Sequence, residues 1–414
     1  MPLTEDVSPS DVVIGLSGVE GTGGLEAGLE AARSGIATYL DGARTRIVVA
    51  GNEPRGDAHP PEDPAAADSV PLSAVGYDVD PRDLLRLPYH GLPGRAHALR
   101  ALLETARDTG ARACAVLDAS HQRVTPEHIR WLVKPILDNQ MDFVTPYYAR
   151  HTADGAITKS ILAPMLRAVF GCSIRQPAAR DFGCSGDTIR HLLAQGVWDE
   201  VGRDEAIDIW MTTEVACSGL RVCEAQFAGA PHVADAADAS TALSQVVGSL
   251  FLEVERRAAQ WQRMRSVSPF CRVGQPVDPE GPEPAIDVRQ LIESFQLGFA
   301  DLEEVWSEIL PPVTVLELRR LAKTPVDRFR LDDRSWARII YDFTVGHHLQ
   351  VIRRDHLLGC LTPLYLGWLS SLVLHTQDAA ATAVAERLEA VCRGFEAEKP
   401  YLISRWRWPE RFRS

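Results

Sequence analysis

The sequence predicts an α/β protein in two parts: a mostly parallel sheet with helices on both faces, and a C-terminal all-α domain. Over residues 11–260, short apolar runs alternate with amphipathic stretches. This alternation is typical of parallel strands joined by helical crossovers. Pro and Gly then accumulate, and beyond them the apolar spacing is helical only. We therefore predict an α/β domain at 1–266, a linker at 267–286 and a helical domain at 287–414.

The predicted strands are short apolar runs between turn residues. The first (11–17, DVVIGLS) ends in small residues, and another (113–118, ACAVLD) ends in an acid. The others lie at 45–50, 142–149 and 221–228. Runs of this length fit strands that are buried on both faces.

The predicted helices carry apolar side chains at three- and four-residue spacing. In the stretch 93–109 these are Leu99, Leu102, Leu103 and Ala106. Thr125 and Pro126 give the next helix an N-cap and a first-turn proline. Further helices are predicted at about 25–39, 158–171, 185–195, 206–219 and 240–264.

Composition restricts the class of partner and the compartment. The formal net charge is −13 (43 basic against 56 acidic residues), which disfavours nucleic acid and anionic lipid as partners. The eight Cys form no C-x-x-C motif, which favours reduced core residues. The acidic, polar N-terminus resembles no signal peptide, and no run of 18 apolar residues occurs. We expect a cytoplasmic protein without a membrane span.

A Gly-rich turn at 18–24 follows the first predicted strand. Such a turn before a helix can hold a phosphate on backbone N–H groups, or can be only a tight turn that needs glycine. The third glycine of a dinucleotide-binding pattern is missing, because Glu26 stands at that offset. An oxidoreductase of the Rossmann type would depend on this turn alone.

Two further candidate sites have acidic or basic side chains. Asp118 ends a predicted strand, where a carboxylate can bind a divalent cation or a ribose hydroxyl, or can serve only as a turn residue. The loop 174–183 combines Arg175, Gln176, Arg180 and Asp181. Its guanidinium groups can bind phosphate or carboxylate, or be solvated surface ions.

Two other residues are candidates because of their neighbours. Asp208 lies at the start of an apolar segment that continues to Thr213. His232 follows the predicted strand at 221–228, where it is either structural or a ligand.

The order of these segments resembles the GT-A-fold glycosyltransferases of the mannosylglycerate synthase and glucosylglycerate synthase type. The match extends over about residues 11–260 and more loosely through the C-terminal helices. The segments that resemble the family are 88–99, 116–120, 148–158, 175–183, 207–213 and 229–232.

Several positions depart from the family pattern. The second acid of the D-x-D motif is Ser120, so the motif is degenerate and cation binding should weaken. Arg95 stands where the family has a lysine that helps to hold the nucleotide diphosphate. Ala179 and Arg180 replace a Gly-Gly pair, which puts a bulky cation where backbone should approach the sugar.

The resemblance implies a retaining hexosyltransferase that uses a nucleotide-diphospho-sugar and a small hydroxy acid such as glycerate or phosphoglycerate. It implies Mg²⁺ or Mn²⁺ as the cofactor, bound by Asp118 and His232. The other implied roles are catalysis for Asp181 and Asp208, donor binding for Arg95, Asp118, Ser120 and Gln176, and acceptor binding for Arg150, Thr152 and Thr213.

An alternative fits the same departures: a non-catalytic GT-A-like binding or regulatory protein that has lost the metal-binding acid. The sequence leaves open the donor base and sugar, the acceptor, metal dependence and the oligomeric state. Aromatic residues of the C-terminal helices could form a homo-oligomer interface, or could be buried within the helical domain. These residues are Trp336, Tyr341, Tyr365 and Trp368.

Overall fold

The computed structural model describes residues 8–18, 22–51, 70–79, 94–119, 124–199, 207–227, 239–265, 271–275, 277–279, 285–377 and 379–409. The chain divides into two compact units. The sheet unit comprises Met1–Ala149, Gln176–His232 and Phe270–Asp278, and the helical unit comprises Arg150–Arg175, Val233–Pro269 and Pro279–Ser414. The division thus groups 150–175 and 233–269 with the C-terminal helices, whereas the sequence boundaries put most of these residues in the first domain.

The described part of the sheet unit contains an eight-stranded sheet in the order β3-β2-β1-β4-β6-β5-β7-β8. The strands are β1 (Val12–Ser17), β2 (Thr45–Gly51), β3 (Leu72–Gly76), β4 (Ala113–Asp118), β5 (Phe143–Tyr148), β6 (Phe182–Ser185), β7 (Val222–Phe227) and β8 (Cys271–Val273). Strand β6 runs antiparallel to β4 and β5, and the other neighbouring pairs are parallel. The predicted α/β class with a mostly parallel sheet is confirmed.

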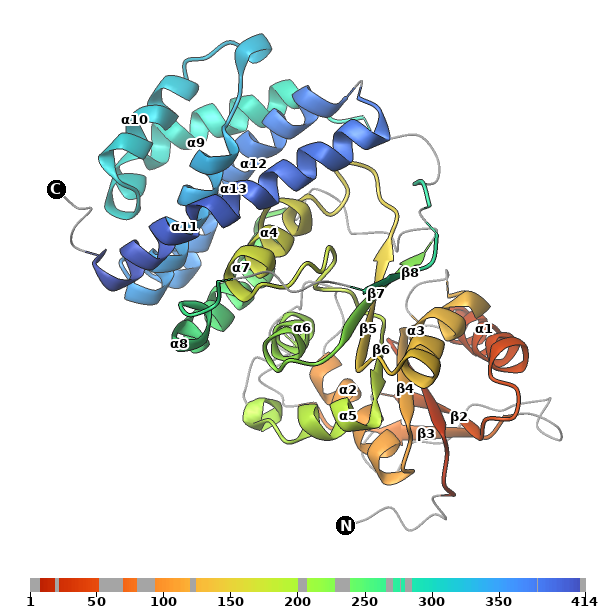
Figure 1. Ribbon diagram of the computed structural model, residues 1–414. Helices are drawn as coiled ribbons and strands as arrows, with labels where there is room; N and C mark the ends of the chain where they lie inside the picture. The colour runs from red at the N-terminus through yellow and green to blue at the C-terminus, as the bar shows by residue number, and fades with distance from the viewer. Residues whose placement is uncertain are drawn as a thin grey trace. The chain divides into compact units, whose positions relative to one another are not determined.

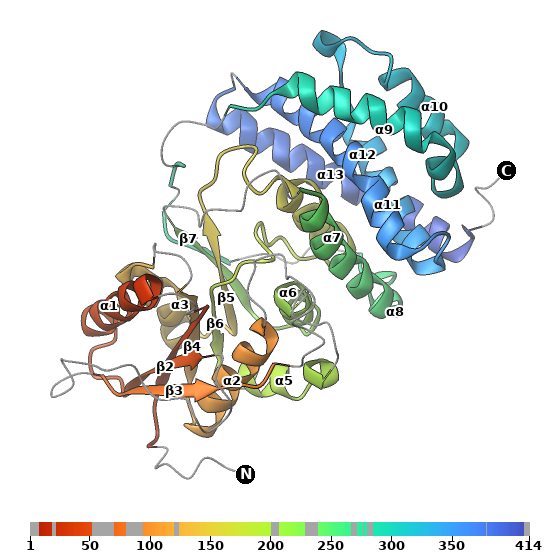
Figure 2. The same ribbon diagram turned by 180° about the vertical axis from the view of Figure 1, so that it is seen from behind.

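Helices cover both faces of this sheet (Figure 1, Figure 2). They are α1 (Thr22–Tyr39), α2 (Arg95–Asp108), α3 (Pro126–Asn139), α5 (Gly186–Leu193) and α6 (Ile207–Cys217). Alternate side chains of β4 point to opposite faces. Cys114 and Val116 belong to the core with α2, α5 and α6, whereas Ala115 and Leu117 belong to the core with α1 and α3.

Strands β3, β6 and β8 are absent from the predicted elements, and β8 lies inside the predicted linker. Strand β6 has only four residues and crosses beneath α3. A Cβ atom at Gly183 would lie 2.0 Å from the backbone oxygen of Leu132, so only glycine allows this approach. Because β6 is antiparallel, its first residue lies at the edge of the sheet where β4 and β5 end.

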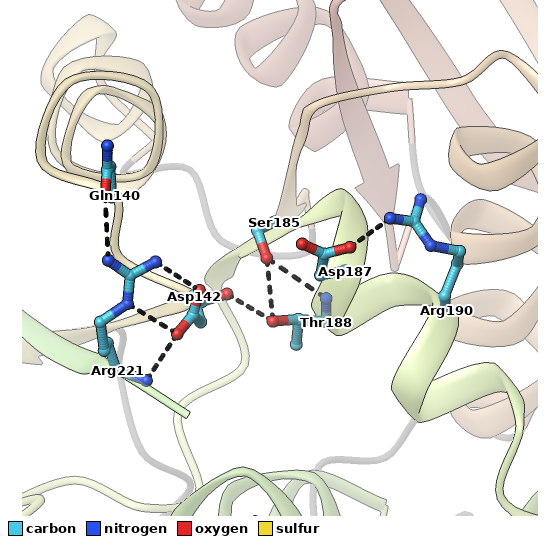
Figure 3. Close-up of polar contacts among 7 residues, drawn as sticks. All are labelled: Gln140, Asp142, Ser185, Asp187, Thr188, Arg190 and Arg221. Atoms are coloured by element: carbon cyan, nitrogen blue, oxygen red, sulfur yellow. Dashed lines mark hydrogen bonds and ion pairs between the residues drawn. The ribbon is translucent and has the colours of Figure 1, made fainter. Parts of the chain in front are cut away.

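The amino edge of the sheet is the edge where β5 and β7 begin, and Figure 3 shows polar contacts of the residues beside these strand starts. There the Arg221 guanidinium donates two hydrogen bonds of 3.0 Å to the Asp142 carboxylate. Thr188 donates its hydroxyl hydrogen to the Asp142 carbonyl at 2.8 Å, and the Ser185 side chain caps α5. On α5, the exposed Arg190 pairs with Asp187. These contacts join the amino ends of β5 and β7 to the start of α5.

The described part of the helical unit contains a π-helical turn and eight α-helices. The turn is Thr158–Leu162, and the helices are α4 (Ala163–Phe170), α7 (Ala239–Arg256), α8 (Ala258–Trp261), α9 (Val288–Ile309), α10 (Pro312–Leu321), α11 (Asp333–Leu349), α12 (Arg354–Thr376) and α13 (Ala381–Arg407), with α8 a single turn. Helix α4 packs against α13, and Arg167 of α4 binds Glu389 and Glu396 of α13. This packing explains why 150–175 groups with the C-terminal helices.

The aromatic residues of the helical unit are buried within it. The rings of Trp336 and Trp368 are stacked with centroids 5.8 Å apart, and Trp336 Nε1 donates to the Ser160 carbonyl at 3.0 Å. Tyr341 and Tyr365 are also buried. These four side chains therefore belong to the core of the unit.

Among the described residues, α12 is long and apolar enough to cross a membrane by length and composition alone. Its most apolar window has a mean hydropathy of 1.7, and 67% of that window is buried. Helix α12 packs against α7, α9 and α11 of the same unit. A single helix of this kind is weak evidence for a membrane span, because mostly buried core helices have the same length and composition.

Candidate functional site

The carboxyl edge of the sheet gathers the acids that the sequence singled out. Asp118 is the last residue of β4, Tyr148 is the last residue of β5, and Asp181 directly precedes the antiparallel β6. All three therefore lie at one edge. In open α/β sheets, ligands bind outside the carboxyl ends of the strands. This edge is the candidate site.

Asp181 links the ends of the two neighbouring strands. Its Oδ1 accepts a 2.7 Å hydrogen bond from the backbone N–H of Asp118, and its Oδ2 accepts the hydroxyl proton of Tyr148. The Tyr148 oxygen lies 3.3 Å from His128 Nε2. Asp181 is 4% exposed and Asp118 1%.

Asp118 forms a buried ion pair with Arg180. Arg180 Nε lies 2.5 Å from Asp118 Oδ2, and the two side chains are 8% and 0% exposed. The sequence placed a bulky cation at Arg180, and the structure puts its guanidinium on the remaining acid of the degenerate D-x-D motif. Asp118 therefore has its charge offset by a side chain of this chain.

Arg95 forms the second buried pair. Its Nε and Nη2 donate to the two carboxylate oxygens of Asp208 at 2.8 and 2.7 Å, and Nη2 also donates to the Arg180 carbonyl at 2.8 Å. The forked geometry matches the planar guanidinium to the carboxylate. Arg95 thus connects the first turns of α2 and α6 to the backbone of the 176–181 loop.

The 176–181 loop is held by hydrogen bonds at two other points. The Gln176 side chain accepts from the Tyr148 backbone N–H at 3.0 Å and donates to the Tyr148 carbonyl at 2.7 Å. Thr212 of α6 donates its hydroxyl to the Pro177 carbonyl at 2.5 Å. The backbone that carries Arg180 and Asp181 is therefore fixed on both sides.

Burial and neighbouring charges act on the pKa values of this network. Burial lowers the pKa of Arg180; Asp118 opposes this, and the charge of Arg95 adds to it. Burial also acts against the charged form of Arg95, but the Asp208 carboxylate outweighs it, so the pKa of Arg95 lies above its ordinary value. For His128, burial lowers the pKa more than Asp181 raises it. His128 is therefore neutral at pH 7.

The five residues that form this network are Arg95, Asp118, Arg180, Asp181 and Asp208, and we call them the strand-end network. Three carboxylates and two guanidinium groups give it a formal charge of −1. Its members come from four separate parts of the chain, and each is at least nine-tenths buried. The sequence predicted sites at Arg95, Asp118, Asp181 and Asp208, and the structure brings these four together.

The predicted acceptor residues fall in different units. Arg150 and Thr152 belong to the helical unit, and Thr213 lies on α6 of the sheet unit. A Cβ atom at Gly155 would lie 2.9 Å from Arg150 Nη1, so a glycine here leaves space for that guanidinium. Thr213 is fully buried, and its hydroxyl has no hydrogen-bond partner among the described residues. The acceptor roles stay predictions.

The described surroundings of Asp118 do not fit a divalent cation bound to its Oδ2. Ser120 and His232 lie outside the described residues. A divalent cation bound to Oδ2 of Asp118 would lie about 2.0–2.6 Å from that oxygen, which already contacts the buried positive charge of Arg180. Within the described ranges, no three His, Cys, Asp or Glu side chains gather as a metal site requires. Asp118 as placed is bound by a guanidinium instead.

Sequence reasoning missed two members of the site's surroundings, Tyr148 and His128. His128 stands at the third position of α3, and its ring nitrogen accepts a 3.1 Å hydrogen bond from the Thr125 backbone N–H. A glutamate or glutamine is usual at that position of a capping box. A histidine there was the one feature of the sequence that could have drawn attention to His128. Of the Gly-rich turn, Gly18 has a positive φ of 74°, and residues 19–21 lie outside the described residues.

No family model matches the sequence, and no curated protein matches it significantly. Among solved structures, glucosyl-3-phosphoglycerate synthase from Mycobacterium tuberculosis in complex with uridine diphosphate is similar at 16% identity and a TM-score of 0.37; the match covers 60% of this chain and 80% of that chain. Mannosyl-3-phosphoglycerate synthase from Rubrobacter xylanophilus has 16% identity and a TM-score of 0.39, covering 63% and 79%.

A third similar structure is CMP:2-keto-3-deoxy-manno-octonic acid synthetase complexed with CTP. It has 11% identity and a TM-score of 0.32, and the match covers 62% of this chain and all of that chain. Every one of these TM-scores is below 0.5.

Proposed function

We propose that this chain is a glycosyltransferase that transfers a hexosyl group from a nucleotide-diphospho-sugar to a small hydroxy acid, such as glycerate or phosphoglycerate. One observation supports the proposal most: segments that resemble the glycosyltransferase family, far apart in sequence, meet in the strand-end network. Arg95, Asp118, Asp181 and Asp208 come from four such segments. Gln176 belongs to the same arrangement through its bonds to Tyr148.

In this proposal the donor binds outside the carboxyl ends of β4 and β5. Asp208 orients the sugar or the acceptor, and Asp181 is the second proposed catalytic carboxylate. Arg150 and Thr152 bind the acceptor carboxylate, with Thr213 as a further acceptor contact, as the resemblance implies. The reaction would retain the anomeric configuration, and we propose a cytoplasmic location. No role is proposed for Mg²⁺ or Mn²⁺, because the Arg180 guanidinium already contacts the Asp118 carboxylate.

A second function is supported by a different observation. Each carboxylate of the strand-end network is already bound by a guanidinium, a hydroxyl or a backbone N–H. A non-catalytic binding or regulatory protein would tolerate this arrangement, whereas a catalyst must expose at least one of these groups to its substrate.

The two functions differ in turnover. A thermal-shift screen of UDP-, GDP- and ADP-sugars identifies the donor, because a ligand that binds only the folded state raises the unfolding midpoint. The donor found is then incubated with glycerate or 3-phosphoglycerate, and mass spectrometry measures the glycosylated acid. Product that is lost in the Asp208→Asn variant supports transfer. Binding without product supports the non-catalytic protein, and the absence of any shift contradicts both.

A further inference from the structure

The position of Arg180 separates this site from one that is completed by a metal ion. Asp118 is the remaining acid of a D-x-D motif whose second acid is Ser120. Its Oδ2 lies 2.5 Å from Arg180 Nε, and neither side chain is more than 8% exposed. A positive charge of the protein thus lies where a divalent cation would have to bind.

The backbone that carries this charge is fixed. The Arg180 carbonyl accepts a 2.8 Å hydrogen bond from Arg95, which is itself bound to both oxygens of Asp208. On the other side of Arg180, Asp181 binds the backbone N–H of Asp118. The backbone of Arg180 is therefore held at its own carbonyl and at the next residue, Asp181, as is expected for a permanent component of the site.

A donor diphosphate needs a compensating positive charge at this edge. A bare Asp118 carboxylate would repel it, and a metal ion normally bridges two such anions. A guanidinium has five N–H donors, more than one carboxylate accepts, and its planar fork matches phosphate oxygens. One guanidinium can therefore offset the charge of Asp118 and also bind phosphate.

We propose that Arg180 replaces the divalent cation, so that the diphosphate of the donor binds at the carboxyl edge of the sheet without metal. This inference rests on the proposed function and defines its cofactor requirement. Arg180 neutralises Asp118 and contacts the diphosphate, whereas Arg95 positions Arg180 through its carbonyl.

The first experiment titrates Mn²⁺ alone into the protein and follows free Mn²⁺ by electron paramagnetic resonance. We expect the wild type and the Asp118→Asn variant to bind the same amount of Mn²⁺, because no Mn²⁺ binds at Asp118. A Mn²⁺ site of one per chain that disappears in Asp118→Asn would overturn the inference, whether or not a nucleotide binds.

The second experiment measures binding of UDP, GDP and ADP by calorimetry, in EDTA and in Mn²⁺. For the nucleotide that binds, we expect wild-type affinities equal within about twofold in the two buffers. Arg180→Ala should weaken binding in EDTA at least tenfold, and Mn²⁺ should restore part of the loss. Arg180→Lys keeps the positive charge, so its nucleotide affinity in EDTA should lie between those of the wild type and Arg180→Ala. Arg190→Ala removes an exposed arginine of the same unit and serves as the matched control (Figure 3).

The outcomes separate this inference from the proposed function. Nucleotide binding that requires Mn²⁺ in the wild type overturns the role of Arg180 and leaves the glycosyltransferase proposal standing. Full affinity of Arg180→Ala in EDTA overturns it as well. Absence of nucleotide binding in both buffers contradicts the proposed function and the inference together. If Arg180→Ala does not fold, Arg180→Lys and the Mn²⁺ titration of the wild type decide.

Discussion

Arg–Asp ion pairs at the two edges of the sheet lie in opposite surroundings. Those at the amino edge include Arg221–Asp142 and Arg190–Asp187, and those at the carboxyl edge are Arg180–Asp118 and Arg95–Asp208. The amino-edge arginine side chains are 53% and 63% exposed, and the carboxyl-edge ones 8% and 5%. A buried pair is often no more stabilising than apolar side chains of the same volume. Stability alone therefore does not explain why the two carboxyl-edge pairs are buried, and we infer that they are buried for a functional reason.

The largest effect is expected when one carboxyl-edge pair is broken. In Asp208→Ala the Arg95 guanidinium stays charged and buried without its carboxylate, because an arginine does not deprotonate to escape this state. We expect the free energy of unfolding to fall by about 3–5 kcal/mol, measured by urea denaturation. The double variant Arg95→Met/Asp208→Leu is expected to recover most of this loss but not nucleotide binding. Recovered binding in the double variant would show that the pair is only structural.

A smaller loss is expected from Tyr148→Phe, which removes the hydroxyl that donates to Asp181 and keeps the ring. A hydrogen bond to a charged group contributes about 1.5–3 kcal/mol, so urea denaturation should show a loss in this range. A change below about 0.5 kcal/mol would mean that Asp181 finds another donor at this edge.

At the amino edge, Arg221→Ala is expected to cost about 1 kcal/mol, and the cost depends on pH. Burial acts to raise the pKa of Asp142, but its hydrogen bonds to Arg221 outweigh this and lower it. An acid whose pKa is lowered by folding stabilises the folded state at pH values above its ordinary pKa, here 3.8. This stabilisation is lost as the pH falls through the lower pKa of the folded state. The difference in the free energy of unfolding between wild type and Arg221→Ala should therefore be largest at pH 7 and become smaller below about pH 4. A pH-independent difference would contradict the assignment to Asp142.

The smallest effect is expected from Arg190→Ala. Both partners of this pair are largely exposed, so the unfolding free energy should change by no more than about 0.5 kcal/mol. Thermal unfolding of this variant beside Asp208→Ala gives the direct contrast between the two edges. A loss as large as that of Asp208→Ala would remove the basis of the comparison.

Local pattern was enough to predict most of the sheet and its helices. The apolar runs that became β1, β2, β4, β5 and β7 were predicted from sequence. The short strands β3, β6 and β8 were not, because their pairing depends on distant segments. Strand β6 shows why: its four residues (FGCS) have little apolar pattern of their own and are held between β4 and β5.

Part of the site was predicted through the resemblance, and part required the structure. The spacing of Asp118, Asp181 and Asp208 contains no information on which of them meet. Arg180 was recognised as a departure from the family pattern, but its contact with Asp118 depends on how the 176–181 loop returns to β4. Tyr148 was included in a segment that resembles the family but was given no role of its own, because a strand-end tyrosine has no distinctive sequence signal.

The most direct test of the strand-end network as a nucleotide-sugar site is hydrogen–deuterium exchange in EDTA, with and without the donor found in the thermal-shift screen. Binding at the carboxyl edge should slow exchange in peptides that cover 95–118, 176–181 and 207–213. Peptides from the amino edge, around Arg221 and Arg190, should change little. Slower exchange confined to the amino edge or the helical unit, or no change anywhere with saturating donor, would contradict the account.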